Sequence, residues 1–101
     1  MAPALGVRTD TTTIWIEGDV DLSTGESFAD AAADALRTTR ALDLAGVTFM
    51  DSTGLNALLL VARTANGTPL VIRNPSPFVR RLLDLTLPQG APGLEICNGS
   101  H

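Results

Sequence analysis

The sequence contains very little cysteine and histidine, and this shortage excludes several kinds of site. Cys97 is the one cysteine, so no disulfide can form within the chain. The one histidine, His101, leaves no set of soft ligands for a metal ion such as zinc. We therefore expect neither a metal nor another cofactor, and we interpret Cys97 as a small apolar side chain at the end of a strand.

Lysine is absent, and basic residues of any kind are few. All seven basic residues are arginine, and they stand against eleven acidic residues, which gives a formal net charge of −4. Nucleic-acid backbones and anionic membrane surfaces attract proteins of the opposite charge. We therefore predict no direct binding to nucleic acid and no binding to a membrane.

Long apolar runs are also missing. The longest one, residues 57–62, is far shorter than the roughly 20 residues that a membrane-spanning helix needs. The opening residues, MAPALGVRTD, lack the basic segment and the apolar stretch of a secretion signal. Both features predict a cytoplasmic protein.

What the sequence does contain is typical of one small globular domain. A length of 101 residues and a hydrophobic content of 45% suit a single buried core. Glycine and proline separate short segments, and no repeat or linker interrupts them. We predict a single domain over residues 1–97, followed by a frayed tail over residues 98–101.

Segments typical of strands recur along the chain. They are rich in β-branched and other apolar residues and are bounded by turn residues. The predicted strands are residues 5–9, 13–17, 41–50, 69–73 and 94–97. The third of them is expected to bend at Gly46.

Three predicted helices lie between these strands. The first begins at Ser23, which has the spacing of a capping box to Glu26. The second begins at the Asp51-Ser52-Thr53 cluster and ends at Asn66-Gly67, since glycine accepts a left-handed position after a helix. The third begins at Ser76-Pro77. The stripes expected to be buried are Phe28, Ala31, Ala32, Ala35 and Leu36; Leu55, Leu58, Leu59 and Ala62, with Leu60 and Val61 covered on a further side; and Phe78, Val79, Leu82 and Leu83.

The alternation of these elements predicts the fold class. We expect an α/β sandwich, in which three or four helices pack against a central mixed, mostly parallel β-sheet of four or five strands. In such sheets functional groups gather where strands pass into the N-termini of helices. Ser52 lies at a junction of this kind.

The segment TFMDSTGLNALL, residues 48–59, supports two compatible interpretations of Ser52. In the first, Ser52 is the N-cap of the second helix, and its hydroxyl accepts a hydrogen bond from the N–H of Gly54 or Leu55. In the second, the helix N-terminus also receives an anion such as a phosphate, which the helix dipole favours.

An acidic patch is expected near Ser52. Asp19 and Asp21 leave the strand of residues 13–17 in the loop GDVDLSTG. If this loop lies beside the second helix start, these carboxylates join Asp51. The alternative is that they are solvated loop residues, with Asp21 or Ser23 acting as a local cap.

The residues argue against an enzyme. A serine nucleophile needs a base within hydrogen-bond reach, and the only histidine lies at the last position. The sequence also lacks the G-x-S-x-G elbow and the glycine-rich phosphate loops of nucleotide-binding proteins. We therefore assign no catalytic residue, and a hydrolase that uses Ser52 is the least favoured hypothesis.

Three motifs resemble the STAS domain of bacterial anti-sigma factor antagonists: GDVDLST, GVTFMDSTGLNALL and NPSPFVRRLLDLT, within residues 14–87. The resemblance implies a STAS-like sandwich and a partner-switching phosphoprotein. Ser52 would be phosphorylated by an anti-sigma factor, a serine kinase that brings its own ATP. The unphosphorylated protein would bind this kinase and release a sigma factor, which regulates transcription, and a PP2C-type phosphatase would reverse the modification.

The resemblance also implies a partner-binding surface around the phosphorylation site. Its expected residues are Asp19, Asp21, Asp51, Thr53, Gly54, Leu55 and Asn56. Asn56 and Leu87 depart from the pattern of the family, and these departures motivate an alternative function. In that alternative the chain is a STAS subunit that binds a fixed partner without phosphorylation, in a transporter such as a lipid-transport complex or in a signalling scaffold.

Overall fold

The computed structural model describes residues 5–97, so the tail expected at residues 98–101 lies outside the described residues. Its strands are β1 (Gly6–Thr9), β2 (Thr13–Val20), β3 (Ala41–Met50), β4 (Leu70–Arg73) and β5 (Leu94–Cys97). Its helices are α1 (Gly25–Thr38), α2 (Ser52–Arg63) and α3 (Pro77–Thr86). The described part of the chain therefore has the order of elements that the sequence predicts.

The strands form one five-stranded sheet in the order β1-β2-β3-β4-β5. β1 is antiparallel to β2, and the remaining neighbours are parallel. Each parallel pair is joined through a helix, as parallel strands require. The predicted α/β class, with a mixed and mostly parallel sheet, is confirmed.

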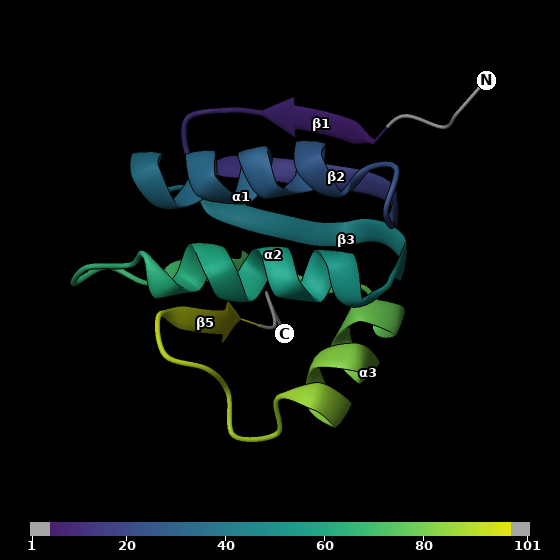
Figure 1. The fold of residues 1–101 in the computed structure, drawn as a ribbon. Helices are drawn as coiled ribbons and strands as arrows, with labels where there is room; N and C mark the ends of the chain where they lie inside the picture. The colour runs from purple at the N-terminus through teal and green to yellow at the C-terminus, as the bar shows by residue number, and fades with distance from the viewer. Residues whose placement is uncertain (1–4, 98–101) are drawn as a thin grey trace.

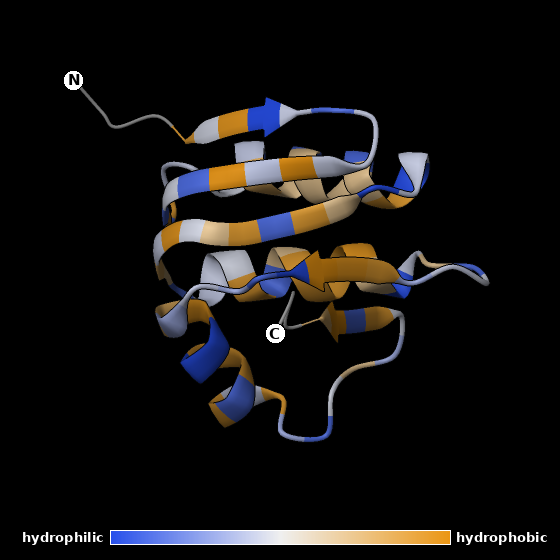
Figure 2. Ribbon diagram, turned by 180° about the vertical axis from the view of Figure 1, so that it is seen from behind, coloured by the Kyte–Doolittle hydropathy of each residue, from blue (hydrophilic) through white to orange (hydrophobic). Residues whose placement is uncertain are grey.

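Helices α1 and α2 lie side by side over one face of the sheet (Figure 1), and α3 packs against β3. Figure 2 shows the opposite face, where the strands lie in front of α1 and α2. Ile14 and Ile16 are buried beneath the helices, whereas Trp15 between them is half-buried. Because side chains alternate along a strand, Trp15 faces away from α1 and α2.

The bend predicted at Gly46 corresponds to an irregular register between β2 and β3. Trp15 pairs with Asp43, and the next paired residues are Glu17 and Gly46. A Cβ at Gly46 would lie 2.7 Å from the Cγ of Glu17, so only glycine fits this close approach without a shift of the neighbour. Asp43, which no sequence pattern singles out, is 5% exposed and accepts hydrogen bonds from Ala45 N–H and from the Asn74 side chain, each at 2.9 Å.

The capping box predicted at the start of α1 is wrong. The N-cap is Thr24, and its side chain makes no capping hydrogen bond. Its hydroxyl instead donates to the carbonyl of Asp19 at 2.7 Å, while Ser23 donates to the carboxylate of Asp21. Both hydroxyls therefore fold the preceding loop, and neither is left to cap the helix.

The predicted end of α2 at Asn66-Gly67 is also wrong. The helix ends at Arg63, and the C-cap residue Thr64 donates its hydroxyl to the carbonyl of Val61 at 2.7 Å. That bond satisfies a carbonyl of the last turn before the chain reaches Gly67, whose positive φ belongs to the following turn. Leu60, expected to be covered, is 58% exposed because its face of α2 meets neither the sheet nor α1.

Helix α3 begins as predicted. The hydroxyl of Ser76 accepts a hydrogen bond from Val79 N–H at 3.3 Å, and Pro77 occupies the first turn. Val79 and Leu83 are buried. Phe78 was expected to be buried with them but is 43% exposed, since its ring meets Phe49 at the molecular surface.

Candidate functional site

The carboxyl ends of β2 and β3 form one edge of the molecule, at the right in Figure 1. Val20 is paired with Met50 in the sheet, and Asp51 N–H donates to the carbonyl of Val20 at 3.1 Å. The loop between β2 and α1 therefore lies beside the start of α2. From the sequence, the acidic loop and Asp51 are neighbours only if the loop lies beside the start of the second helix. The parallel pairing of β2 with β3 places it there.

Asp51, and not Ser52, is the N-cap of α2. Asp51 has the extended backbone typical of a cap, with φ −103° and ψ −167°, and its carboxylate accepts a hydrogen bond from Thr53 N–H at 2.8 Å. The predicted capping role of Ser52 is therefore wrong. Ser52 is the first residue of the helix and is exposed, and its hydroxyl makes no hydrogen bond to any residue in the described part of the chain.

The two loop carboxylates are both near this edge and each has a structural partner. Asp19 accepts from the Thr48 hydroxyl at 2.6 Å, which joins β2 to β3. Asp21 accepts from the hydroxyl and the N–H of Ser23, at 2.7 and 2.9 Å. The hydrogen bond from the Ser23 hydroxyl is the main reason why the pKa of Asp21 is lowered. Asp21 therefore acts as a local turn residue, and the expectation that Asp21 or Ser23 caps the helix is wrong, because the N-cap is Thr24.

The other expected partner-binding residues differ widely in exposure. Thr53 and Leu55 are half-buried, Gly54 is buried and Asn56 is exposed. A Cβ at Gly54 would lie 2.6 Å from the Cγ of Met50 and 2.7 Å from a methyl group of Val20. Gly54 therefore seats α2 on the sheet and presents no side chain, whereas Asn56 is open to a partner.

Three exposed apolar residues near this edge were missed by sequence reasoning. Leu22, in the loop between β2 and α1, is 86% exposed. Phe49 is 40% exposed and contacts Phe78 of α3, with ring centroids 5.3 Å apart. One feature of the sequence could have drawn attention to them: Phe49 and Phe78 are two of the four aromatic residues in the chain. The register irregularity opposite Gly18 and Asp19 leaves Thr48 as an extra residue in β3, which shifts the alternation at the end of β3, and a strict period of two does not predict such a shift.

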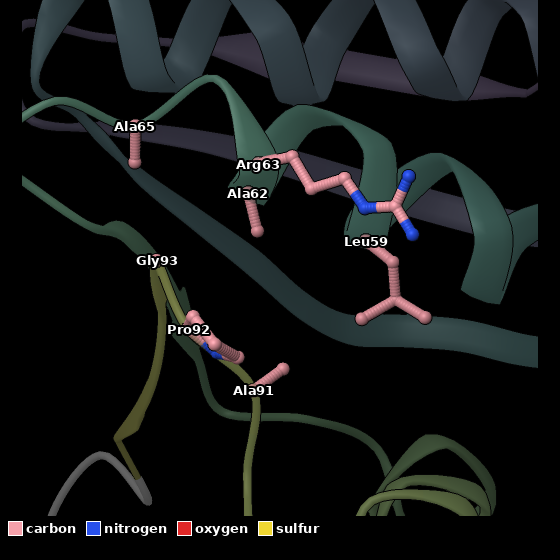
Figure 3. A pocket seen from close by; sticks show the side chains of 7 residues that line it. All are labelled: Leu59, Ala62, Arg63, Ala65, Ala91, Pro92 and Gly93. Atoms are coloured by element: carbon pink, nitrogen blue, oxygen red, sulfur yellow. The ribbon is translucent and has the colours of Figure 1, made fainter.

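A separate hollow lies at the other end of α2 (Figure 3). It has a volume of about 510 Å³ and is lined mainly by small and apolar side chains from α2 and from the loop before β5. Arg63 supplies its one charged group. Since Ser52 is the first residue of α2 and Arg63 is the last, this hollow is no part of the Ser52 region.

Residues 5–97 carry neither a metal-ligand cluster nor a membrane-spanning helix. Within that range no group of three or more histidine, cysteine or acidic residues is placed to hold a metal ion. No helix among the same residues has the length and apolar character needed to cross a membrane.

Comparisons with known proteins agree with one another. A family model described as Mlab, STAS domain, matches residues 4–86. A STAS-domain containing protein of Pseudomonas aeruginosa (strain UCBPP-PA14) is 35% identical over 78 residues, which cover 73% of this chain and 77% of that protein. The structure of the anti-sigma factor antagonist SpoIIAA in its unphosphorylated form is similar with a TM-score of 0.61 and 18% identity, over 95% of this chain and 89% of that one. At this identity the structural likeness shows a shared fold.

Proposed function

The chain belongs to the STAS domain family, and from this premise we propose that it is an anti-sigma factor antagonist that is switched by phosphorylation of Ser52. Unphosphorylated, it binds an anti-sigma factor that is a serine kinase, and a sigma factor is released. Phosphorylated, it dissociates until a PP2C-type phosphatase removes the phosphate. The protein is the substrate of these enzymes and not a catalyst, and it acts in the cytoplasm, where the kinase finds ATP.

The observation that carries this proposal is the exposed hydroxyl of Ser52 at the first residue of α2. Because Asp51 caps the helix, Ser52 can be modified without loss of the capping hydrogen bond. The N-terminus of a helix also favours a phosphate, through its unpaired N–H groups and the helix dipole. The position is therefore suited to a modification that leaves the fold intact.

The free energy that a phosphorylation switch requires indicates where the partner binds. A phosphate adds about −1.5 to −2 charges, and inverting a binding equilibrium from 1:99 to 99:1 needs about 5.5 kcal/mol. Two unit charges about 4 Å apart interact by about 1 kcal/mol in water and by about 4 kcal/mol near a protein surface. Charge repulsion at a distance is therefore insufficient, and Ser52 belongs inside the footprint of the partner.

Within this proposal, the footprint includes the residues around Ser52. Asp19, Asp21 and Asp51 supply negative charge, and exposed Asn56 supplies a polar contact on α2. Thr53, Gly54 and Leu55 act mainly by holding the start of the helix in place, since they are half-buried or buried. The sequence-based list of partner-binding residues thus divides into side chains that face a partner and side chains that support them.

Phosphate transfer tests the proposal directly. The protein is incubated with a purified anti-sigma factor kinase and Mg·ATP, and intact mass and peptide mapping follow the product. We expect one added phosphate, its loss in Ser52→Ala, and its retention in the control Ser27→Ala, which changes an exposed serine in the first turn of α1. A phosphate that maps to another residue would contradict the site.

A second candidate function is a STAS subunit that binds a fixed partner without phosphorylation, in a transporter or a signalling scaffold. The departures of Asn56 and Leu87 from the pattern of the family motivate it. The two functions differ in their response to Ser52→Asp. A purified complex with a transporter subunit that survives this substitution would favour the second function, whereas a complex with a kinase that dissociates would favour the first.

A further inference from the structure

The hollow at the C-terminal end of α2 (Figure 3) lies between the end of that helix and the loop before β5. A Cβ at Gly93 would lie 2.1 Å from the carbonyl oxygen of Ala62, and the φ of Gly93 is +78°, so only glycine fits at this contact. The carbonyl of Gly93 accepts a hydrogen bond from Leu70 N–H at 2.8 Å, and that of Ala91 accepts one from Leu94 N–H at 3.2 Å. The loop is therefore tied to the sheet and held against α2, and the hollow is preformed.

The hollow exists because its walls carry small side chains. Ala62, Ala65 and Ala91 leave the space open, while Leu59 and Pro92 supply apolar surface. The volume of about 510 Å³ lies in the range of roughly 300–1,000 Å³ that is typical of small-molecule sites. At about 30 Å³ for each water molecule, it corresponds to roughly 17 waters. A ligand of about a dozen non-hydrogen atoms therefore fits.

Arg63 gives the hollow a positive charge that no carboxylate in its walls offsets. Between residues 52 and 72 Arg63 is the only charged residue, and residues 85–94 contain no charged residue. Its side chain is exposed and makes no ion pair or hydrogen bond within the part of the chain that the structure describes. The hollow is therefore positive, although the whole chain has a formal net charge of −4.

The direction of the Arg63 side chain separates a ligand-binding role from a role at the end of the helix. A basic residue in the last turn of a helix commonly complements the negative end of the helix dipole. Figure 3 shows the guanidinium directed along α2 toward Leu59, one turn earlier, and away from Ala65. It donates no hydrogen bond to the last carbonyls of the helix, so its N–H groups are open at the rim of the hollow.

We propose that this hollow binds a small apolar carboxylate, whose hydrocarbon part lies against Leu59, Ala62 and Pro92 and whose carboxylate pairs with Arg63. The guanidinium presents parallel N–H groups that match the two oxygens of a carboxylate. A phosphate ester would need further donors, and no second charged residue lines the hollow. The site lies at the end of α2 opposite to Ser52 and does not depend on the proposed function.

A titration with octanoate tests the site. Proton–nitrogen NMR spectra of the full chain, recorded at neutral pH, give both the Kd and the position of the bound molecule. We expect the largest shifts at the amides of Ala65, Ala91 and Gly93. Octylammonium has the same chain length and the opposite charge, so its Kd at these amides should be at least fivefold higher, although the acidic protein as a whole attracts cations.

Substitutions separate the two parts of the site. Arg63→Gln should raise the Kd for octanoate at least fivefold and reduce the difference between the two probes. The control Arg81→Gln removes an exposed arginine of α3 that does not line the hollow, and its Kd should stay within twofold of the unmodified protein. Ala91→Phe fills the hollow and should abolish binding. Circular dichroism and the urea midpoint check folding, and Arg63→Gln decides if Ala91→Phe does not fold.

Four results would each overturn the site. The first is the absence of shifts with octanoate at about 20 mM, well above a Kd of about 1 mM. The second is a set of shifts that maps to another part of the molecule. The third is binding of octylammonium to the hollow as tightly as octanoate. The fourth is an unchanged Kd for octanoate in Arg63→Gln, or a rise in Arg81→Gln as large as the rise in Arg63→Gln.

Discussion

At the scale of single residues, Asp51 caps α2 and the neighbouring Ser52 carries an exposed hydroxyl, so the two properties belong to different side chains. The carboxylate of Asp51 accepts the hydrogen bond that begins α2, and the next hydroxyl is left exposed. If Ser52 were the cap, a phosphate on it would replace a structural hydrogen bond. The start of the helix would therefore stay fixed if the neighbouring Ser52 were phosphorylated.

Substituting each residue in turn separates these two properties. We expect Asp51→Ala to lower the free energy of unfolding by about 1 kcal/mol, because it removes the N-cap acceptor. Ser52→Ala should change it by less than about 0.5 kcal/mol, as for an exposed residue without a structural bond. Urea unfolding followed by circular dichroism measures both. Equal destabilisation by the two substitutions would assign the cap to both residues.

The sequence placed a cap at this junction but assigned it to the wrong residue. Aspartate and serine are almost equally good N-caps, so residue preference does not choose between neighbours. The choice is made by the backbone, since Asp51 keeps the extended conformation in which β3 ends and Ser52 already belongs to the helix. That transition depends on where the strand stops pairing, which involves residues distant in the sequence.

At the scale of elements, the starts of α1 and α2 are fitted to each other. A Cβ at Gly25, the first residue of α1, would collide with the methyl group of Thr53 in the first turn of α2. Gly25 is buried and does not have a positive φ, so its small size and not its conformational freedom is what this contact requires. The loop that carries Leu22 ends at this contact, and its position is therefore coupled to that of Ser52.

A double-mutant cycle tests the coupling between the two helices. We expect Gly25→Ala to cost about 1–3 kcal/mol in free energy of unfolding, because the added methyl group overpacks a close contact. In a Thr53→Ser background, which lacks the opposing methyl group, the cost should fall below about 0.5 kcal/mol. Urea unfolding of the four proteins gives the interaction energy. The same cost in both backgrounds would show that Thr53 is not the obstacle.

The order of elements could be predicted from the sequence, whereas several of their ends could not. Strands were recognisable because glycine and proline separate short β-branched runs, as in LVIR of β4. The end of α2 was missed because Thr64, which has no strong preference as a helix terminator, satisfies a last-turn carbonyl with its own hydroxyl. Exposure of Phe78 depends on the position of α3 relative to Phe49, a tertiary property that helical periodicity does not contain.

At the scale of the whole molecule, the parallel sheet gathers the side chains of the candidate site. The carboxyl ends of β2 and β3 meet at one edge, which brings the acidic loop beside the start of α2. This gathering was predictable once a parallel sheet was expected, because such strands end at the same side. The exposure of Leu22, Phe49 and Phe78 was not, since these residues come from a loop, a strand and a helix that no local pattern relates.

Acidic pH should destabilise the whole molecule through two loop carboxylates. The pKa of Asp10 is lowered below the ordinary value of 3.8, mainly by a hydrogen bond from Thr12 N–H. The pKa of Asp21 is lowered below the same value, mainly by the hydroxyl of Ser23. A carboxylate with a lowered pKa in the folded state stabilises it above the unfolded pKa, and this contribution is lost as pH falls through the folded pKa.

We therefore expect the urea midpoint to be lower at a pH below the folded pKa values than at neutral pH. The double variant Asp10→Asn/Asp21→Asn should show a smaller difference between the two conditions, because its amides accept hydrogen bonds but do not titrate. Glu26→Gln, which changes an exposed carboxylate in the first turn of α1, serves as the control and should retain the full difference. An unaltered difference in the double variant would locate the acid sensitivity elsewhere.

The Arg8–Trp15 pair supplies a fluorescent reporter that is remote from Ser52. Trp15 is the only tryptophan, and the guanidinium of Arg8 lies 4.7 Å from the centre of its ring. It precedes Val20, at the end of β2, by five residues, which is about 16 Å along a strand, and it faces away from α1 and α2. Indole emission therefore follows the pairing of β1 with β2 and is insensitive to the chemical state of Ser52, so a fluorimeter can tell a phosphorylated protein that is still folded from one that has lost its structure.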